Sequence, residues 1–157
     1  MDPLQIQLKL AENNCHKRGI RLTIKRKQVL TILLQANKAI SAYELMALFK
    51  NKFKQKLAPM SVYRVLNFFE SIHLVHKLNT INKYIACAHM DCEQSHQLAQ
   101  FLVCQQCQHV EEVNTHTFNL ENIVQSVEQH NYQLVSPHIE LNCICHDCLE
   151  KNNLTTA

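Results

Sequence analysis

The sequence is poor in the residues that build flexible connections, with one glycine and three prolines among its 157 residues. This composition excludes glycine-rich phosphate-binding loops, collagen-like repeats and low-complexity linkers. No apolar run approaches the length of a membrane span, and the N-terminal Met-Asp-Pro-Leu-Gln lacks the basic flank and apolar core of a signal peptide. We therefore expect a cytoplasmic protein that needs no membrane partner. Because 46% of its residues are hydrophobic, it should form a packed core.

Acidic residues are scarce in the first half of the chain, and basic residues are nearly absent from the second. Residues 1–86 contain 15 Lys/Arg and 4 Asp/Glu, a net charge of +11, whereas residues 87–157 contain 1 and 9, a net charge of −8. Adjacent segments of opposite charge indicate two domains with different partners, and the basic half favours a polyanion, above all nucleic acid. We divide the chain into a DNA-binding domain (1–86), a hinge (87–97) and a second domain (98–157).

Helical patterns fill most of the first half. Leu4, Leu8 and Ala11 predict a first helix that ends near Gly19, a residue suited to a C-cap. Thr23 is an N-cap for a second helix that runs to Gln35, with an apolar face formed by Val29, Leu30, Leu33 and Leu34. Ser41 and Glu44 have the spacing of a capping box and open a third helix, whose apolar positions are Leu45, Leu48 and Phe49.

A fourth helix, predicted over residues 59–71, has the character of a DNA-reading helix. Its apolar face is Val62, Val65, Leu66 and Phe69, and its opposite face is Met60, Tyr63, Arg64, Asn67 and Ser71. An arginine can donate two hydrogen bonds to a guanine edge, and an asparagine can pair with adenine. Alternating segments at 73–78 and 83–87 predict a hairpin. Helices followed by a hairpin are typical of a winged helix-turn-helix.

An ordinary amphipathic helix with a solvated face explains the fourth helix equally well when that helix is taken alone. The charge asymmetry favours DNA binding instead. A basic run lies where phosphate contacts are expected, and it comprises Arg18, Arg21, Lys25, Arg26 and Lys27.

Cysteines dominate the chemistry of the second half. Cys104 and Cys107 form one C-x2-C pair, and Cys145 and Cys148 form another. Two such pairs complete a tetrahedral S4 shell with no open position, which is typical of a structural zinc site, and thiolates favour zinc over magnesium, calcium or manganese. A single pair would equally suit thioredoxin-like redox chemistry. A reducing cytosol further favours metal binding over disulfides.

The 37 residues between the two pairs are more than a simple zinc ribbon needs. They predict a strand at 110–113, a helix at 118–129 and a strand at 133–142, with another strand at 98–103 before the first pair. The helix should bury Leu120, Ile123, Val124 and Val127. We therefore expect an α+β chain whose zinc fastens a small second domain with a thin core. The unpaired strand edges of that domain could be covered by a second copy.

Further possible metal donors lie in both halves and around the hinge. They are His76, Cys87, His89, Cys92, His96, His109, Glu111, Glu112 and His116. Taken singly, each histidine is more often a surface or core residue, and each glutamate belongs to a solvated strand face. Their density across 87–96 makes a second, mixed-donor metal site at the hinge the better joint interpretation.

Several motifs together resemble the ferric uptake regulator (Fur) superfamily. They are Arg21-Leu-Thr-Ile-Lys-Arg26, Ser61-Val-Tyr-Arg-Val-Leu66, Val75-His76-Lys77 and the two C-x2-C pairs in this order. The resemblance covers residues 4 to 150. Within the superfamily, Ala39-Ile-Ser-Ala-Tyr43-Glu-Leu, residues 68–77, and Cys87 followed by His96 are most similar to the zinc uptake regulator (Zur) branch.

This resemblance implies a zinc-responsive homodimeric repressor of zinc-uptake genes that binds palindromic operator DNA, with two zinc ions per chain. It also implies an N-terminal winged-helix domain and a C-terminal α/β dimerisation domain, residues 98–157, that is fastened by the four-cysteine zinc. The regulatory zinc is then bound by His76, Cys87, His96 and Glu112, and Cys87 favours zinc because the iron-sensing branch has no thiolate in its sensor site. Tyr43 and Arg64 match positions that contact DNA in this branch. The chain departs from the family at Ile24 and Lys25, where proline and glutamine are usual, and in a longer loop before Cys104.

Other interpretations stay open at this point. His89 and Cys92 are alternative ligands to His96, and His116 could contribute to a third site. Rival functions are a C-x-x-C redox sensor, a non-regulatory zinc-ribbon nucleic-acid-binding protein, and a Fur-type regulator of iron, manganese or peroxide responses. We expect no enzyme and no small-molecule substrate. The nearest catalytic pattern, His138-Ile-Glu140, lacks the cysteine order of a zinc deaminase.

Overall fold

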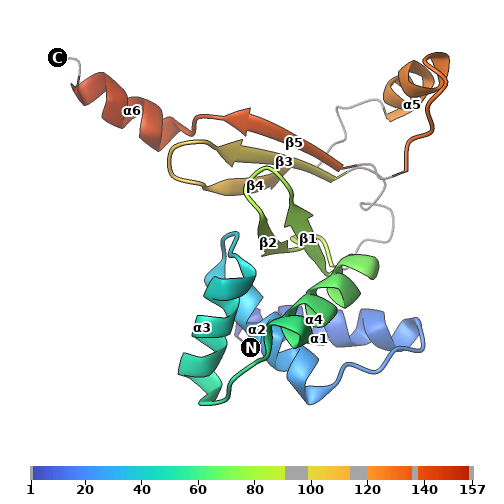
Figure 1. Cartoon of the computed structure of the whole chain (residues 1–157), viewed down its shortest axis with the longest axis vertical. Coiled ribbons are helices and arrows are strands. Elements are labelled where there is room, and N and C mark those ends of the chain that lie inside the picture. Colours follow the sequence, from blue (N-terminus) through green and yellow to red (C-terminus); the bar gives the residue numbers. More distant parts are fainter. Residues whose placement is uncertain (1, 91–98, 114–119, 136–137, 156–157) are drawn as a thin grey trace. The chain divides into compact units, whose positions relative to one another are not determined.

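The computed structural model describes residues 2–90, 99–113, 120–135 and 138–155 (Figure 1). The chain divides into two units, Met1–Cys92 and Glu93–Ala157, each with its own internal contacts. In the described residues, no helix is both long and apolar enough to cross a membrane. We describe each unit by itself.

Capping residues set the ends of the first helices. Helix α1 (Pro3–Lys17) is followed by Gly19 at φ +68°, and the N–H groups of Gly19 and Ile20 donate to the carbonyls of His16 and Cys15. This is a Schellman motif, which needs a left-handed residue that glycine adopts without strain. Helix α2 (Ile24–Ala36) begins at Thr23, whose hydroxyl accepts from the Arg26 N–H. Both predicted boundaries are confirmed.

Helices α3 and α4 complete the helical part of the first unit. Helix α3 (Ala42–Phe53) opens with the predicted capping box, because Ser41 and Glu44 each accept the other's backbone N–H, at 3.1 and 2.6 Å. The hydrogen bond from the Ser41 N–H lowers the pKa of the Glu44 carboxyl. Burial opposes this effect and the nearby Lys83 adds to it, so the net shift of the pKa is downward. Helix α4 (Pro59–Ser71) begins with proline, which the first turn tolerates.

A two-stranded wing follows the helices. Strands β1 (Val75–Leu78) and β2 (Lys83–Ala86) pair antiparallel, with His76 opposite Ile85. Ile40, just before α3, exchanges two backbone hydrogen bonds with Tyr84 and so ties the wing to the helices. The predicted winged helix-turn-helix is therefore present, with a slightly shorter hairpin than expected.

The core of the first unit lies between the helices and the wing. Its largest fully buried side chains are Phe49, Phe69, Leu30, Leu33, Ile40, Leu45, Leu66, Leu74, Leu78, Val29 and Val62. Leu48, one of the three apolar positions named for the third helix, lies outside this core, because its side chain is 41% exposed. It lines a surface pocket of about 390 Å³ between α2 and α3 together with Ile32, Ala36 and Lys52.

The second unit is a three-stranded sheet with two helices. Its elements are β3 (Ala99–Cys104), β4 (Val110–Val113), α5 (Leu120–Gln129), β5 (His138–Cys143) and α6 (His146–Thr155). The strand order is β4-β3-β5, in which β3 pairs antiparallel with β4 and parallel with β5. The fold class is α+β, as expected. The buried core is small, and Phe101, Val103 and Val110 are its main apolar members.

Two expectations for the second unit need correction, and one helix was not expected. Residues 133–135 are not in a strand, since β5 starts at His138. The apolar residues Ile123, Val124 and Val127 of α5 are half-buried rather than buried. Helix α6 had no counterpart in the sequence patterns. Residues 98 and 118–119, where a predicted strand and a predicted helix begin, lie outside the described residues.

Candidate metal centres and nucleic-acid interface

Four cysteine sulfurs of the second unit form a compact cluster. The Sγ atoms of Cys104, Cys107, Cys145 and Cys148 all lie within 4.8 Å of one another. The Cys104–Cys148 and Cys107–Cys145 separations are 3.9 and 3.6 Å. A tetrahedral zinc ion with Zn–S bonds of about 2.3 Å requires sulfur–sulfur edges of roughly 3.8 Å. The four residues therefore fit a structural zinc ion.

The sheet explains why two cysteine pairs separated by 37 intervening residues meet. Strand β5 lies parallel to β3 in a register that sets Cys143 opposite Cys104. The first C-x2-C pair spans the turn that ends β3, and the second follows the end of β5, so both pairs reach the same end of the sheet. The Gln105 N–H donates to the Cys143 carbonyl at 2.9 Å and holds this end together.

Backbone N–H groups stabilise the thiolate form of one cysteine in the cluster. N–H groups of Cys107 and then Cys145 lower the pKa of the Cys104 thiol to about 6, and the Cys145 N–H lies 3.3 Å from its sulfur. Hydrogen bonding with the Cys145 thiol, followed by burial, raises the pKa of Cys148 to about 12. Without a cation, the crowded thiols thus cannot all ionise near neutral pH. A divalent ion replaces the shared protons, so binding should release protons.

A second donor pair lies in the wing of the first unit. His76 and Cys87 are 8% and 2% exposed, and their ligand atoms lie within 4.8 Å of each other. The Cys87 N–H donates to the Leu74 carbonyl, which extends the β1–β2 ladder by one pair. His76 faces Ile85, and Cys87 is two residues further along, so both side chains are on one face. The Cys87 sulfur also accepts from the His89 N–H at 3.4 Å.

The other predicted donors are distributed as follows. Glu112 is a half-buried residue of β4 opposite Phe101, and Glu111 beside it is exposed. His89 is half-buried at the end of the first unit, and His109 is exposed before β4. Three further candidates lie outside the described residues, namely Cys92, His96 and His116.

The discounted His138-Ile-Glu140 pattern forms a local ion pair. The His138 Nε2 atom lies 2.8 Å from Glu140 Oε1, and the glutamate side chain is only 7% exposed. The imidazole also packs on the Phe101 ring, with centroids 5.0 Å apart. These contacts explain why two polar side chains are found at the edge of the small core of the second unit.

The exposed face of α4 carries the predicted DNA-reading residues. Tyr63, Arg64 and Asn67 are exposed, while Val62, Leu66 and Phe69 are buried on the opposite face. Tyr43 of α3 is 71% exposed. An exposed tyrosine, arginine and asparagine on the second helix of a helix-turn-helix match what a major groove accepts.

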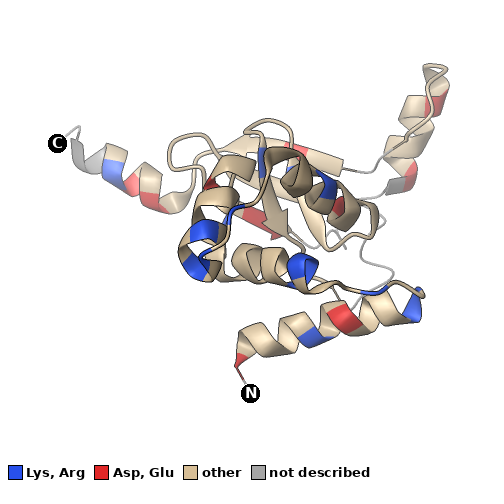
Figure 2. Cartoon of the chain, turned by 60° about the horizontal axis from the view of Figure 1, so that its bottom comes forward, with Lys and Arg blue, Asp and Glu red and all other residues tan. Residues whose placement is uncertain are grey.

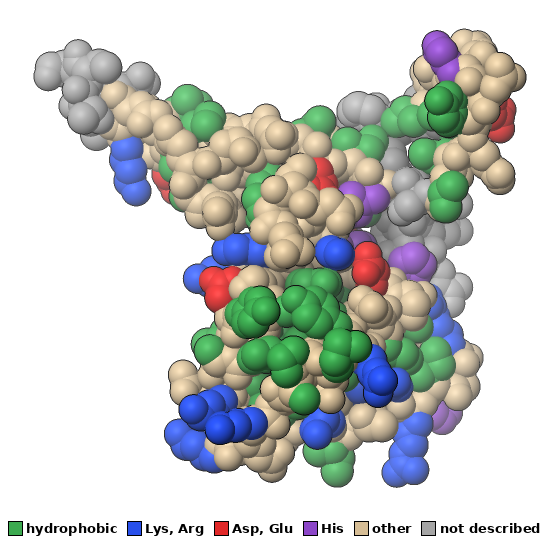
Figure 3. Space-filling view, in the orientation of Figure 1, with side chains coloured by type: hydrophobic (Ala, Val, Ile, Leu, Met, Phe, Trp, Pro, Cys, Tyr) green, Lys and Arg blue, Asp and Glu red, His purple; other side chains and the backbone are tan. Residues whose placement is uncertain are grey.

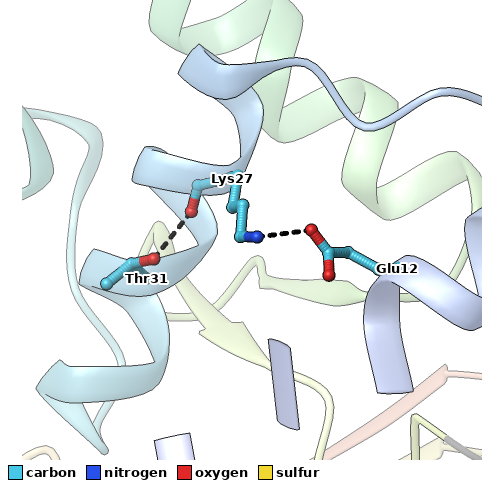
Figure 4. Close-up of polar contacts among 3 residues, drawn as sticks. All are labelled: Glu12, Lys27 and Thr31. Carbon is cyan, nitrogen blue, oxygen red and sulfur yellow. Dashed lines mark hydrogen bonds and ion pairs between the residues drawn. The ribbon is translucent and has the colours of Figure 1, made fainter. Parts of the chain in front are cut away.

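The predicted phosphate-contacting run is partly engaged within the fold. Lys27 of α2 forms an ion pair with Glu12 of α1 at 2.5 Å (Figure 4). The Arg26 guanidinium lies 3.5 Å from the centroid of the Phe68 ring, and Arg18 donates to the Ile72 carbonyl. Arg21 and Lys25 are exposed and remain able to meet phosphates.

A second basic segment lies outside the run that precedes α2, and the sequence patterns above did not predict it. It comprises Lys50, Lys52, Lys54 and Lys56, which lie at the end of α3 and in the link to α4. Figure 2 shows basic residues on the helices of the first unit. The alternation of lysine with other residues over positions 50–56 was the available signal.

Comparisons with known proteins agree with this architecture. Residues 17–148 match the model of the ferric uptake regulator family. The chain is 33% identical over 141 residues to the zinc uptake regulation protein of Escherichia coli (strain K12), covering 89% of this chain and 80% of that protein. A solved zinc uptake regulator in complex with zinc and DNA superimposes with a TM-score of 0.85 at 30% identity, covering 98% of this chain and 99% of that one. The crystal structure of holo XcZur gives 0.79 at 28% identity, covering 91% and 96%.

Proposed function

This chain belongs to the ferric uptake regulator family, and on that basis we propose that it is a zinc-responsive transcriptional repressor. The zinc-loaded homodimer binds palindromic operator DNA and represses zinc-uptake genes in the cytoplasm. The similarity to a zinc uptake regulation protein and to a regulator bound to zinc and DNA supports this function. The observation that carries it is the buried imidazole–thiol pair, His76 and Cys87, in the wing of a DNA-binding unit.

Zinc is the metal that best suits this pair. Imidazole nitrogen and thiolate sulfur are preferred zinc donors, whereas manganese and magnesium favour oxygen. Two donors leave a tetrahedral shell half filled. We propose that Glu112 and His96 complete it, so that the chain binds two zinc ions, one in the cysteine cluster and one in this regulatory site. His89 and Cys92 are the alternatives to His96.

A regulatory site with donors from both units couples metal binding to their arrangement. His76 belongs to the unit that carries α4, and Glu112 belongs to the unit with the sheet. Such a set of donors is complete only in some arrangements of the two units. Zinc therefore favours those arrangements, by at most its difference in affinity between them.

DNA recognition is assigned to the exposed residues of the first unit. Arg64 and Asn67 read base edges, and Tyr43 and Tyr63 contact the operator beside them. Arg21, Lys25 and Arg26 contact phosphates, with Arg26 contributing from its position over Phe68. A twofold dimer presents two α4 helices to two half-sites of a palindrome. The chain acts as a regulator and not as an enzyme.

The decisive experiment measures zinc content and operator binding together. An operator is selected from random duplexes with the zinc-loaded protein, and its Kd is followed by fluorescence anisotropy while a chelator buffers free zinc. Native mass spectrometry counts zinc per chain. We expect two zinc ions, with only the weaker one coupled to DNA affinity. Operator binding that persists after loss of the weaker zinc would instead favour a non-regulatory zinc-ribbon protein.

Matched variants identify the regulatory ligands. Cys87→Ser should bind one zinc and lose zinc-dependent operator binding, whereas Cys15→Ser, at another buried cysteine of the first unit, should retain both. In the second unit, Glu112→Gln should raise the free zinc needed for binding, and Glu111→Gln should leave it unchanged. Equal behaviour within either pair refutes that ligand assignment.

A further inference from the structure

A lysine segment links the two helices of the helix-turn-helix. Lys50 and Lys52 lie in the last turn of α3, Lys54 is its C-cap, and Lys56 precedes Pro59, the first residue of α4. All four are exposed. No acidic residue occurs between Glu44 and Glu70. Figure 3 shows the basic side chains gathered over the end of α3 and the link to α4.

The charges of the lysine segment are not neutralised within the first unit. Lys27 and Lys83 have carboxylate partners, Glu12 at 2.5 Å and Glu44 at 3.6 Å. In the lysine segment, Lys52 donates to the neutral Gln35 side chain. Among the residues that the structure describes, no ion pair involves any of its four lysines. The segment therefore presents a dense, uncompensated positive charge.

Lys54 occupies a backbone conformation that favours glycine. Its φ is +55°, and its N–H donates to the Lys50 carbonyl at 3.0 Å, which closes the end of α3. A non-glycine residue in the left-handed region is strained. A lysine at this position thus places a cation beside the start of α4 at some expense of local stability.

We propose that the lysine segment contacts the phosphates that flank the major groove entered by α4, and supplies a sequence-independent part of operator affinity. In helix-turn-helix proteins the first helix crosses the DNA backbone and the second enters the groove. The link between them then passes along the groove edge, where the phosphates lie. Lysine ammonium groups are suitable point charges for phosphate oxygens. This inference rests on the proposed DNA-binding function.

Salt dependence gives the size of the expected effect. Each phosphate neutralised on duplex DNA contributes about 0.9 to the slope of log affinity against log salt concentration. Removing two contacting lysines from each chain of the dimer, four in all, should therefore reduce this slope by roughly 3.6. Because phosphate contacts carry no base information, affinities for operator and unrelated duplex should fall by the same factor.

The test variant is Lys54→Gly/Lys56→Gln, and the control is Lys9→Gln/Lys38→Gln, which removes the same charge from exposed positions elsewhere in the first unit. Glycine at position 54 relieves the backbone strain, so this variant should melt no lower than the wild type, and an affinity loss does not reflect unfolding. Operator and unrelated duplex are titrated at saturating zinc between 50 and 200 mM salt, a range in which phosphate contacts produce large affinity changes, on the order of 10³–10⁵ for 6–10 contacts.

A reduced slope in the test variant, with little change in the control, supports the proposal. Equal reductions in both variants would show a long-range effect of net charge and overturn it. An unchanged slope, or a loss confined to the operator, would also overturn it. Failure of the wild type to bind any selected duplex would refute the proposed function itself, and is thereby distinguished from failure of this inference.

Discussion

Replacing Cys148 by serine should unfold the second unit while the first unit stays folded. The two units have very different cores. The first buries many large side chains completely, among them Phe49, Phe69 and Leu66, whereas in the described part of the second unit the fully buried apolar side chains are Phe101 and Val103. We therefore expect the second unit to depend on its metal for stability.

The magnitude follows from the closed S4 geometry of the cluster. Structural zinc contributes about 10–16 kcal/mol to the folding of small zinc domains. Whole domains are stable by only about 5–15 kcal/mol. Losing roughly half of the zinc contribution would thus match the whole stability of an ordinary domain. One missing thiolate should be enough to unfold the unit at 37 °C.

The assay combines native mass spectrometry, thermal unfolding and limited chymotrypsin digestion of the full chain, because chymotrypsin has sites throughout the second unit, such as Phe101, Tyr132 and Leu141, whereas trypsin has only Lys151. Cys148→Ser should lose the tightly bound zinc and become sensitive to protease after residue 98, with an unchanged transition for the first unit. Cys143→Ser is the matched control, because Cys143 lies opposite Cys104 in the sheet but outside the cluster. The reasoning is refuted if Cys148→Ser lacks this zinc but has the same melting transitions and the same protease resistance as Cys143→Ser.

Further predictions concern the folding of each unit. Ser41→Ala removes the capping box and should cost about 1 kcal/mol, which lowers the melting temperature of the first unit by roughly 4–8 °C. Because its pKa is lowered in the fold, Glu44 contributes stability that is present above its ordinary pKa of 4.5 and lost as the pH falls through the lowered value. The difference in denaturant midpoint between wild type and Glu44→Gln should therefore shrink at acid pH, and a constant difference would contradict this. Gly19→Ala should lower the free energy of unfolding by roughly 1–2 kcal/mol, since φ at this position is +68°. An added Cβ would meet no atom within 4 Å, so the change measured by urea unfolding reports backbone strain alone. Phe101→Ala should cost about 3–5 kcal/mol and weaken zinc retention in a chelator competition, whereas an unchanged retention would show that sheet and cluster are independent.

Local chemistry allowed much of this protein to be predicted from its sequence. The caps at Gly19, Thr23 and Ser41 depend on residues within a few positions, and each was predicted correctly because its hydrogen bonds are local. The same holds for the C-x2-C pairs, in which two intervening residues allow both sulfurs to share one metal. The wing and the fourth helix likewise followed from residue periodicity.

Contacts between distant residues could not be predicted in this way. The parallel register of β3 and β5, with Cys104 opposite Cys143, determines that the two cysteine pairs meet. Leu48 repeats at core spacing, yet it is exposed because the neighbouring helices leave a pocket around it. Arg26 appears in the sequence as one more cation, but the packing of α4 sets Phe68 beneath it.

The sequence by itself determined the helix ends, the charge of each half and the thiolate pairs, because these depend on neighbouring residues. Only the tertiary structure decided which cysteines converge, which lysines remain unpaired and how deeply His76 and Cys87 are buried. These properties arise from the pairing of strands and the packing of helices that lie far apart in the chain. The sulfur cluster, and a lysine segment without carboxylate partners among the described residues, are therefore products of the fold, although every residue in them is visible in the sequence.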